Sequence, residues 1–121
     1  MSAVEPFSAV EIIAAKRDKF TLTNPQIDWV VDAYTRGVVA DEQMSALLMA
    51  ILLNGMNSQE ISRWTNAMIN SGEKMNWSAL DRPTVDKHST GGVGDKSTLP
   101  LAPLVAACGA AVPQLSGRGL G

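Results

Sequence analysis

The sequence is short of the features that most quickly place a protein in a class. It has one cysteine among 121 residues, so an internal disulfide is excluded and a reducing compartment, the cytoplasm, is expected. Its net charge of −2 argues against broad nucleic-acid binding. The longest apolar run, residues 44–53, is interrupted only by Ser45 and is too short to span a membrane. Residues 1–8 contain no basic side chain, so no secretory signal is expected.

Apolar residues still make up 45% of the chain, which is enough for the core of one ordinary domain. In residues 1–72 they recur at helical spacing and predict an all-helical lobe. We interpret their stripes as core, with a cofactor pocket and a subunit interface as alternatives. The charged run 16–19 is expected to be a solvated helix end. Four helices are predicted, with N-cap residues at Ser8, at Thr23 or Asn24, at Asp41, and at Asn57 or Ser58.

The pattern changes after a linker at residues 73–83. A short strand is predicted at 84–86, a helix at 97–107, and a second strand that begins at Ala111 and is limited by Pro113. Cys108 lies in an apolar run and is expected to be buried. Strand, crossover helix and strand form one βαβ unit, and two parallel strands alone are marginal. The predicted fold class is therefore α/β: the helical lobe, then the first βαβ unit of a larger, truncated α/β domain at residues 84–121.

The most informative segment is Lys87-His88-Ser89-Thr90-Gly91-Gly92-Val93-Gly94. A lysine and two hydroxyls precede three glycines (Gly91, Gly92 and Gly94), whose bare N–H groups can approach a ligand closely. The predicted helix begins just beyond, and a helix N-terminus attracts anions. Phosphate is the most economical ligand. Neither the Walker loop nor the dinucleotide fingerprint fits these residues, so ATP hydrolysis and NAD binding are not supported. The alternative is a glycine-rich turn with incidental polar residues.

A second glycine-rich segment, Ser116-Gly117-Arg118-Gly119-Leu120-Gly121, follows the apolar stretch 110–115. Ser116 offers one more hydroxyl. Both loops would leave the carboxyl ends of parallel strands, where ligands bind in α/β folds, so they should face one pocket.

These two segments resemble the thymidine phosphorylase and pyrimidine-nucleoside phosphorylase family, and residues 11–18 and 71–72 are similar to it as well. The resemblance implies that phosphate attacks C1′ of a pyrimidine nucleoside and releases the base and a sugar 1-phosphate. It implies that His88 donates to the departing base and that the phosphate ligands are Lys87, Ser89, Thr98 and Ser116. It also implies that the chain is the N-terminal part of a longer enzyme, inactive alone, and a homodimer through the helical lobe.

The resemblance implies no cofactor and no metal, since phosphate is a co-substrate. Lys96 departs from the family, which commonly has a small hydroxyl or apolar residue there. Some relatives hold a monovalent cation nearby, and the charge of Lys96 would disturb or replace it. Phosphate and a pyrimidine nucleoside are the expected partners, without nucleic acid or membrane. Two alternatives stay open: an anthranilate-type phosphoribosyltransferase, and a non-enzymatic phosphate-binding or helical interaction module.

Overall fold

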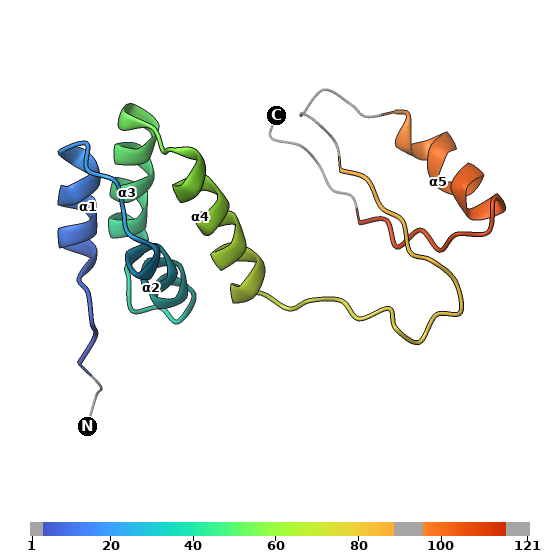
Figure 1. Cartoon of the computed structure of the whole chain (residues 1–121), viewed down its shortest axis with the longest axis horizontal. Coiled ribbons are helices and arrows are strands. Elements are labelled where there is room, and N and C mark those ends of the chain that lie inside the picture. The colour runs from blue at the N-terminus through green and yellow to red at the C-terminus, as the bar shows by residue number, and fades with distance from the viewer. Residues whose placement is uncertain (1–3, 89–95, 116–121) are drawn as a thin grey trace. The chain divides into compact units, whose positions relative to one another are not determined.

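The computed structural model describes residues 4–88 and 96–115. The chain divides into two compact units, Met1–Lys74 and Met75–Gly121, which are treated separately below. The predicted domain limits at residues 72 and 84 stay a prediction. The described helices are α1 (Ala9–Arg17), α2 (Asn24–Thr35), α3 (Asp41–Asn54), α4 (Ser58–Ser71) and α5 (Thr98–Ala107) (Figure 1). None of these helices is long and apolar enough to cross a membrane.

Local capping residues decide where the first helices begin. Ser8 Oγ accepts a hydrogen bond from Glu11 N at 3.2 Å, as the sequence predicted for the start of α1. Helix α1 ends at Arg17 rather than near Lys19, because Lys19 takes a left-handed conformation with φ 67° that ends the helix. At α4, Asn57 Oδ1 accepts from Glu60 N at 2.9 Å while Glu60 Oε2 accepts from Asn57 N at 2.8 Å.

The predicted cap of α3 is one residue too late. Asp41 is already the first residue of the helix, and Ala40 occupies the N-cap position. The physical reason is that Gln43 closes this end, because its Oε1 accepts from Ala40 N at 3.1 Å. The Asp41 carboxylate is used elsewhere and accepts from the hydroxyl of Tyr34 at 3.1 Å.

The first unit has one apolar core, to which α1, α2 and α3 contribute buried side chains. Helix α1 packs against α3, and α2 packs against α4. The side chains with the least exposure are Ile12, Ile27, Leu47 and Val30. Removing such side chains from water is the main stabilising term of a small helical unit. The prediction of core is therefore confirmed for Ile27, Val30 and Val31 of α2 and for Met44 and Leu47 of α3. It was wrong for the apolar stripe of α4, where Ile61, Met68 and Ile69 are each more than half exposed.

The charged run at the end of α1 is not a solvated helix end throughout, and that prediction was wrong for Lys16. Its side chain is 5% exposed, and Nζ lies 2.8 Å from Glu60 Oε1 on α4. The same oxygen accepts from Leu22 N at 2.8 Å. Lys16 faces inward because Ile12 lies one turn before it on the same side of α1. Arg17, one residue on, is exposed and pairs with Asp18.

The predicted βαβ unit is not formed by the described residues of the second unit. Its two predicted strands meet in a single parallel bridge between Thr84 and Ala111. Ala111 N donates to Pro83 O and Val85 N donates to Ala111 O, each at 2.9 Å. The next rung of a parallel ladder needs the N–H of residue 113, and Pro113 has none, so the pairing ends there.

Helix α5 follows its predicted limits, Thr98–Ala107, and carries Pro103 inside it. None of its side chains is fully buried. The prediction that Cys108 is buried was wrong. The residue occupies the C-cap position, just beyond the last turn of α5, and its thiol is exposed.

Candidate functional site

Lys87 and Thr98, two of the predicted phosphate ligands, line the same small cavity in the second unit. Lys87 lies at the end of segment 85–87, and Thr98 is the first residue of α5. Both are half-buried. The cavity, about 50 Å³, lies between this segment, residues 112–114 and α5. Its lining residues are Val85, Asp86, Lys87, Thr98, Leu101, Ala102, Val105, Val112 and Gln114.

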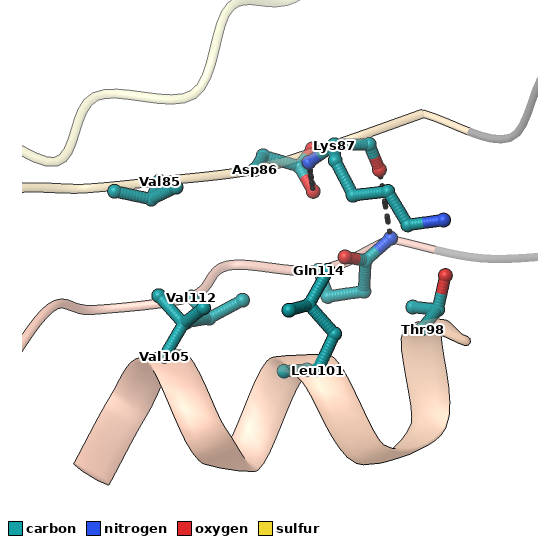
Figure 2. A pocket seen from close by; sticks show the side chains of 9 residues that line it. Val85, Asp86, Lys87, Thr98, Leu101, Val105, Val112 and Gln114 are labelled. Atoms are coloured by element: carbon teal, nitrogen blue, oxygen red, sulfur yellow. Dashed lines mark hydrogen bonds between the residues drawn. The ribbon is translucent and has the colours of Figure 1, made fainter. Parts of the chain in front are cut away.

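The side chains around the cavity divide into an apolar end and a polar end (Figure 2), and the inner surface of the cavity is almost entirely apolar. Val85, Val112 and Val105 form the apolar end, which lies over the C-terminal part of α5. Lys87, Gln114 and Thr98 gather at the other end, over the first turn of the helix. Apolar packing on α5 therefore fixes where along the helix the two extended segments place their polar residues.

The polar end combines two features that favour an anion. The ammonium of Lys87 supplies a full positive charge and three donors. Thr98 opens helix α5, whose N-terminal N–H groups and dipole favour negative charge. A hydroxyl, an ammonium and a helix N-terminus at one place can hold an oxyanion by hydrogen bonds without a metal. Among the described residues, no group of three or more His, Cys, Asp or Glu side chains is placed to hold a metal ion.

Gln114 belongs to this site, and the sequence analysis missed it. Its Nε2 donates to the carbonyl oxygen of Lys87 and to that of Leu115, each at 3.3 Å. The residue was counted within the apolar stretch 110–115. The signal in the sequence was a single amide side chain inside this apolar stretch, two positions before Ser116 begins the second glycine-rich segment.

His88 and Lys96 are both exposed. The predicted residues Ser89, Gly91, Gly92, Gly94 and Ser116 lie outside the described residues. The structure thus brings Lys87 and Thr98 together, while the roles of all the predicted site residues stay a prediction.

Comparison with known proteins gives the same division of the chain into helical and mixed parts. Residues 10–72 match the glycosyl transferase family, helical bundle domain, and residues 81–121 match the glycosyl transferase family, a/b domain. In chain order, a helical bundle domain is therefore followed by an a/b domain. Because the first match covers more than half of the sequence, the chain belongs to this glycosyl transferase family.

Individual relatives are similar over nearly the whole chain. A thymidine phosphorylase of Mycobacterium tuberculosis is 64% identical over 115 residues, which is 95% of this chain and 27% of the relative. A pyrimidine-nucleoside phosphorylase of Geobacillus stearothermophilus is 50% identical over 93% of this chain and 26% of its own length. A thymidine phosphorylase of Rhizobium meliloti is 54% identical over 92% of this chain and 25% of its own length. The chain thus spans about a quarter of the length of these relatives.

Proposed function

We propose that this chain is part of a pyrimidine-nucleoside phosphorylase, specifically a thymidine phosphorylase. The protein would convert a pyrimidine nucleoside and phosphate into the free base and a sugar 1-phosphate. The observation that carries the proposal is the 64% identity to a thymidine phosphorylase over 95% of the chain. The enzyme class is that of the pentosyltransferases, and the substrates are inorganic phosphate and a pyrimidine nucleoside.

In this proposal the attacking phosphate binds at the polar end, outside the apolar interior of the cavity and beside the first turn of α5. Lys87 and Thr98 line this end together, and Ser89 and Ser116 are proposed to complete the set of ligands. Gly91, Gly92 and Gly94 are proposed to offer main-chain N–H groups. A dianion held by donors fixed in advance costs little reorganisation when the glycosidic bond breaks.

His88 is proposed to donate a proton or hydrogen bond to the departing pyrimidine. The residue directly follows Lys87 and stands at the start of the glycine-rich loop that is proposed to bind phosphate. Negative charge grows on the base as that bond breaks, and histidine is the side chain whose proton is most easily given near neutral pH.

The assay that tests the function uses the full-length natural protein. Thymidine or uridine is incubated with and without inorganic phosphate, and free base and sugar phosphate are separated by chromatography. The proposal expects base release that requires phosphate and yields one sugar 1-phosphate for each base. Formation of a phosphoribosyl anthranilate from anthranilate and the pyrophosphorylated ribose donor would instead assign the anthranilate-type alternative.

We also propose that residues 84–86 and 111–112 are parallel strands of a larger sheet in the full-length protein. The parallel bridge between Thr84 and Ala111 supports this, as does the match of residues 81–121 to the a/b domain. Additional strands would pair with the open edges, and helices would cover the faces that parallel strands do not leave in water.

A homodimer through the helical lobe is proposed on the outer face of α3. Leu48, Met49, Leu52 and Leu53 are 50%, 54%, 75% and 74% exposed and follow one another around this side of the helix. A helix that is apolar on both its inner and its outer faces is typical of one covered on both sides. A second copy of the same face would cover these side chains.

The proposed reaction needs no cofactor besides its co-substrate phosphate. Lys96 places a positive charge at the first loop, where it would take the place of a monovalent cation. Activity that is the same in potassium and in tetramethylammonium buffers would agree with this, whereas a strict potassium requirement would contradict it.

A further inference from the structure

Gln114 provides a side-chain hydrogen bond at the point where the main-chain pairing ends. Pro113 has no N–H to give to the opposite segment, and Lys87 N donates to Asp86 Oδ1 at 2.8 Å. One residue after the proline, Gln114 Nε2 donates to the Lys87 carbonyl at 3.3 Å (Figure 2). The same nitrogen donates to the carbonyl of Leu115 at 3.3 Å.

These two bonds join the two places from which the glycine-rich segments leave. Lys87 is the last residue before His88 and the first loop, and Leu115 directly precedes Ser116 in the second. One amide group, with two donor hydrogens, reaches both carbonyls. Because Gln114 is half-buried, its hydrogen bonds are partly shielded from competing water.

The position of the Lys87 backbone matters because its side chain is long and flexible. An ammonium on four methylene groups can occupy many rotamers, and its direction depends on where its Cα is held. The Lys87 N–H donates to the neighbouring Asp86 Oδ1 and not to the opposite segment, and Gln114 supplies a hydrogen bond from that segment to Lys87. The Gln114 amide therefore restrains the residue that carries the proposed charge.

We propose that Gln114 is a positioning residue of the phosphate site, whose side-chain amide joins the carbonyls of Lys87 and Leu115 and so fixes Lys87 for phosphate. This inference rests on the proposed function and adds a residue to it. Gln114 acts through Lys87 and is not assigned a contact with substrate.

The test uses the full-length natural protein and the variant Gln114→Met, which keeps the length of the side chain and removes the amide. The matched control is Gln59→Met, the same change at an exposed position in the first turn of α4. Four quantities are measured: kcat, KM for phosphate, KM for nucleoside, and the affinity for inorganic phosphate alone by titration calorimetry. Circular dichroism and thermal unfolding report whether each variant is folded.

The expected result is selective. Gln114→Met raises KM and Kd for phosphate about three- to tenfold, the range expected for loss of one or two neutral hydrogen bonds, and leaves KM for nucleoside unchanged. Gln59→Met changes none of these. If Gln114→Met fails to fold, Gln114→Asn replaces it, since it retracts the amide by one carbon and should give the same split.

A merely structural glutamine would behave differently. Two results for Gln114→Met would overturn the inference: a lowered unfolding temperature with unchanged KM and Kd for phosphate, or equal increases in both KM values. In either case the unmodified enzyme would still require phosphate, so the proposed function would stand. Failure of the proposed function itself is seen in the unmodified protein, which would then neither bind inorganic phosphate nor use it, and this result overturns the inference as well.

Discussion

The ammonium of Lys16 on α1 lies 2.8 Å from Glu60 Oε1 on α4, and the two side chains are 5% and 3% exposed. The residues are 44 positions apart in the sequence. Glu60 also accepts from Leu22 N and from Asn57 N, each at 2.8 Å. One carboxylate thus ties together the end of α1, the turn before α2 and the start of α4. Because this carboxylate holds three segments together, removal of its cation Lys16 should lower the free energy of unfolding.

Lys16→Met should destabilise the chain by about 3–5 kcal/mol, because it leaves the Glu60 carboxylate buried without its cation. Chemical denaturation followed by circular dichroism measures the loss. The double variant Lys16→Met/Glu60→Gln should recover part of it, since a neutral amide does not need a cation. Arg17→Met, which breaks only an exposed ion pair, is the matched control and should leave the denaturation midpoint nearly unchanged. A cost for Lys16→Met no larger than for Arg17→Met would show that the buried pair contributes nothing.

Acid should weaken the first unit through Glu60. Burial raises the pKa of this carboxyl, but hydrogen bonds from Lys16, Leu22 N and Asn57 N outweigh burial and hold the pKa below its usual value near 4.5. Since the folded pKa lies below that of the unfolded chain, the stabilisation is complete above about pH 4.5. It is lost as the pH falls through the folded value.

The measurement is the unfolding free energy between pH 7 and pH 3. Glu60→Gln should lower stability at neutral pH and flatten its decline in acid, because the group that binds the proton is gone. Glu42→Gln, a change at an exposed glutamate in the first turn of α3, is the control and should keep the slope of the natural chain. Equal slopes for Glu60→Gln and the natural chain would assign the acid sensitivity to other carboxylates.

Leu52→Glu should convert the proposed dimer of the full-length protein into a monomer. The residue is 75% exposed on the outer face of α3, so the fold of the monomer should tolerate the charge. A glutamate facing its symmetry mate would be desolvated next to a like charge, which opposes association. Light scattering after gel filtration gives the mass. Val38→Glu, at a 47% exposed position between α2 and α3, should leave the mass unchanged. A monomeric natural protein would refute the dimer.

Lys87→Ala should weaken phosphate far more than nucleoside in the full-length protein. Loss of a hydrogen bond to a charged group predicts an increase of about 10- to 150-fold in KM for phosphate. Lys74→Ala removes a lysine outside the cavity and should leave both KM values as they are. Phosphate saturation curves at fixed nucleoside give the answer, and unchanged saturation in Lys87→Ala would remove Lys87 from the site.

His88→Ala should lower kcat by about 100-fold or more, as expected for loss of a general acid. The loss should shrink for a nucleoside whose base is more acidic, because such a base leaves with less help. Comparing thymidine with such a substrate under saturating phosphate tests this directly. Equal losses on the two substrates would assign His88 a structural role.

The sequence predicted the helices well because their signals are local. Ser8, Thr23 and Asn57 are capping residues, so the starts of these helices could be inferred. Helical spacing also predicted the inner face of α2 correctly, but not that of α4, whose one buried residue is Glu60. The burial of Lys16 could not be inferred in this way. It depends on Glu60, which is distant in the sequence, and only the packing of the helices brings the two together.

The candidate site was predictable in part for the same reason. Lys87 and Thr98 were singled out by residue type and by their place beside a loop and a helix start, and the structure puts them on one cavity. Gln114 was missed because its partners are main-chain carbonyls, which any residue has and no sequence pattern displays. The strands were overestimated because apolar alternation predicts extended backbone, whereas pairing also requires an N–H that Pro113 lacks.

Cys108 gives the chain a single chemical handle. It is the only cysteine in the sequence and its thiol is exposed at the end of α5 in the second unit. A polarity-sensitive maleimide dye would therefore attach at one atom of the folded chain, and its emission would report the surroundings of that atom in the second unit. Trp29 and Trp64, two of the three tryptophans, lie in the first unit and dominate intrinsic fluorescence there. Trp77, the third tryptophan, lies in the second unit, so the variant Trp77→Phe restricts tryptophan emission to the first. Dye emission and tryptophan emission of this variant, recorded during denaturation, would reveal whether the two units unfold in one transition or in two.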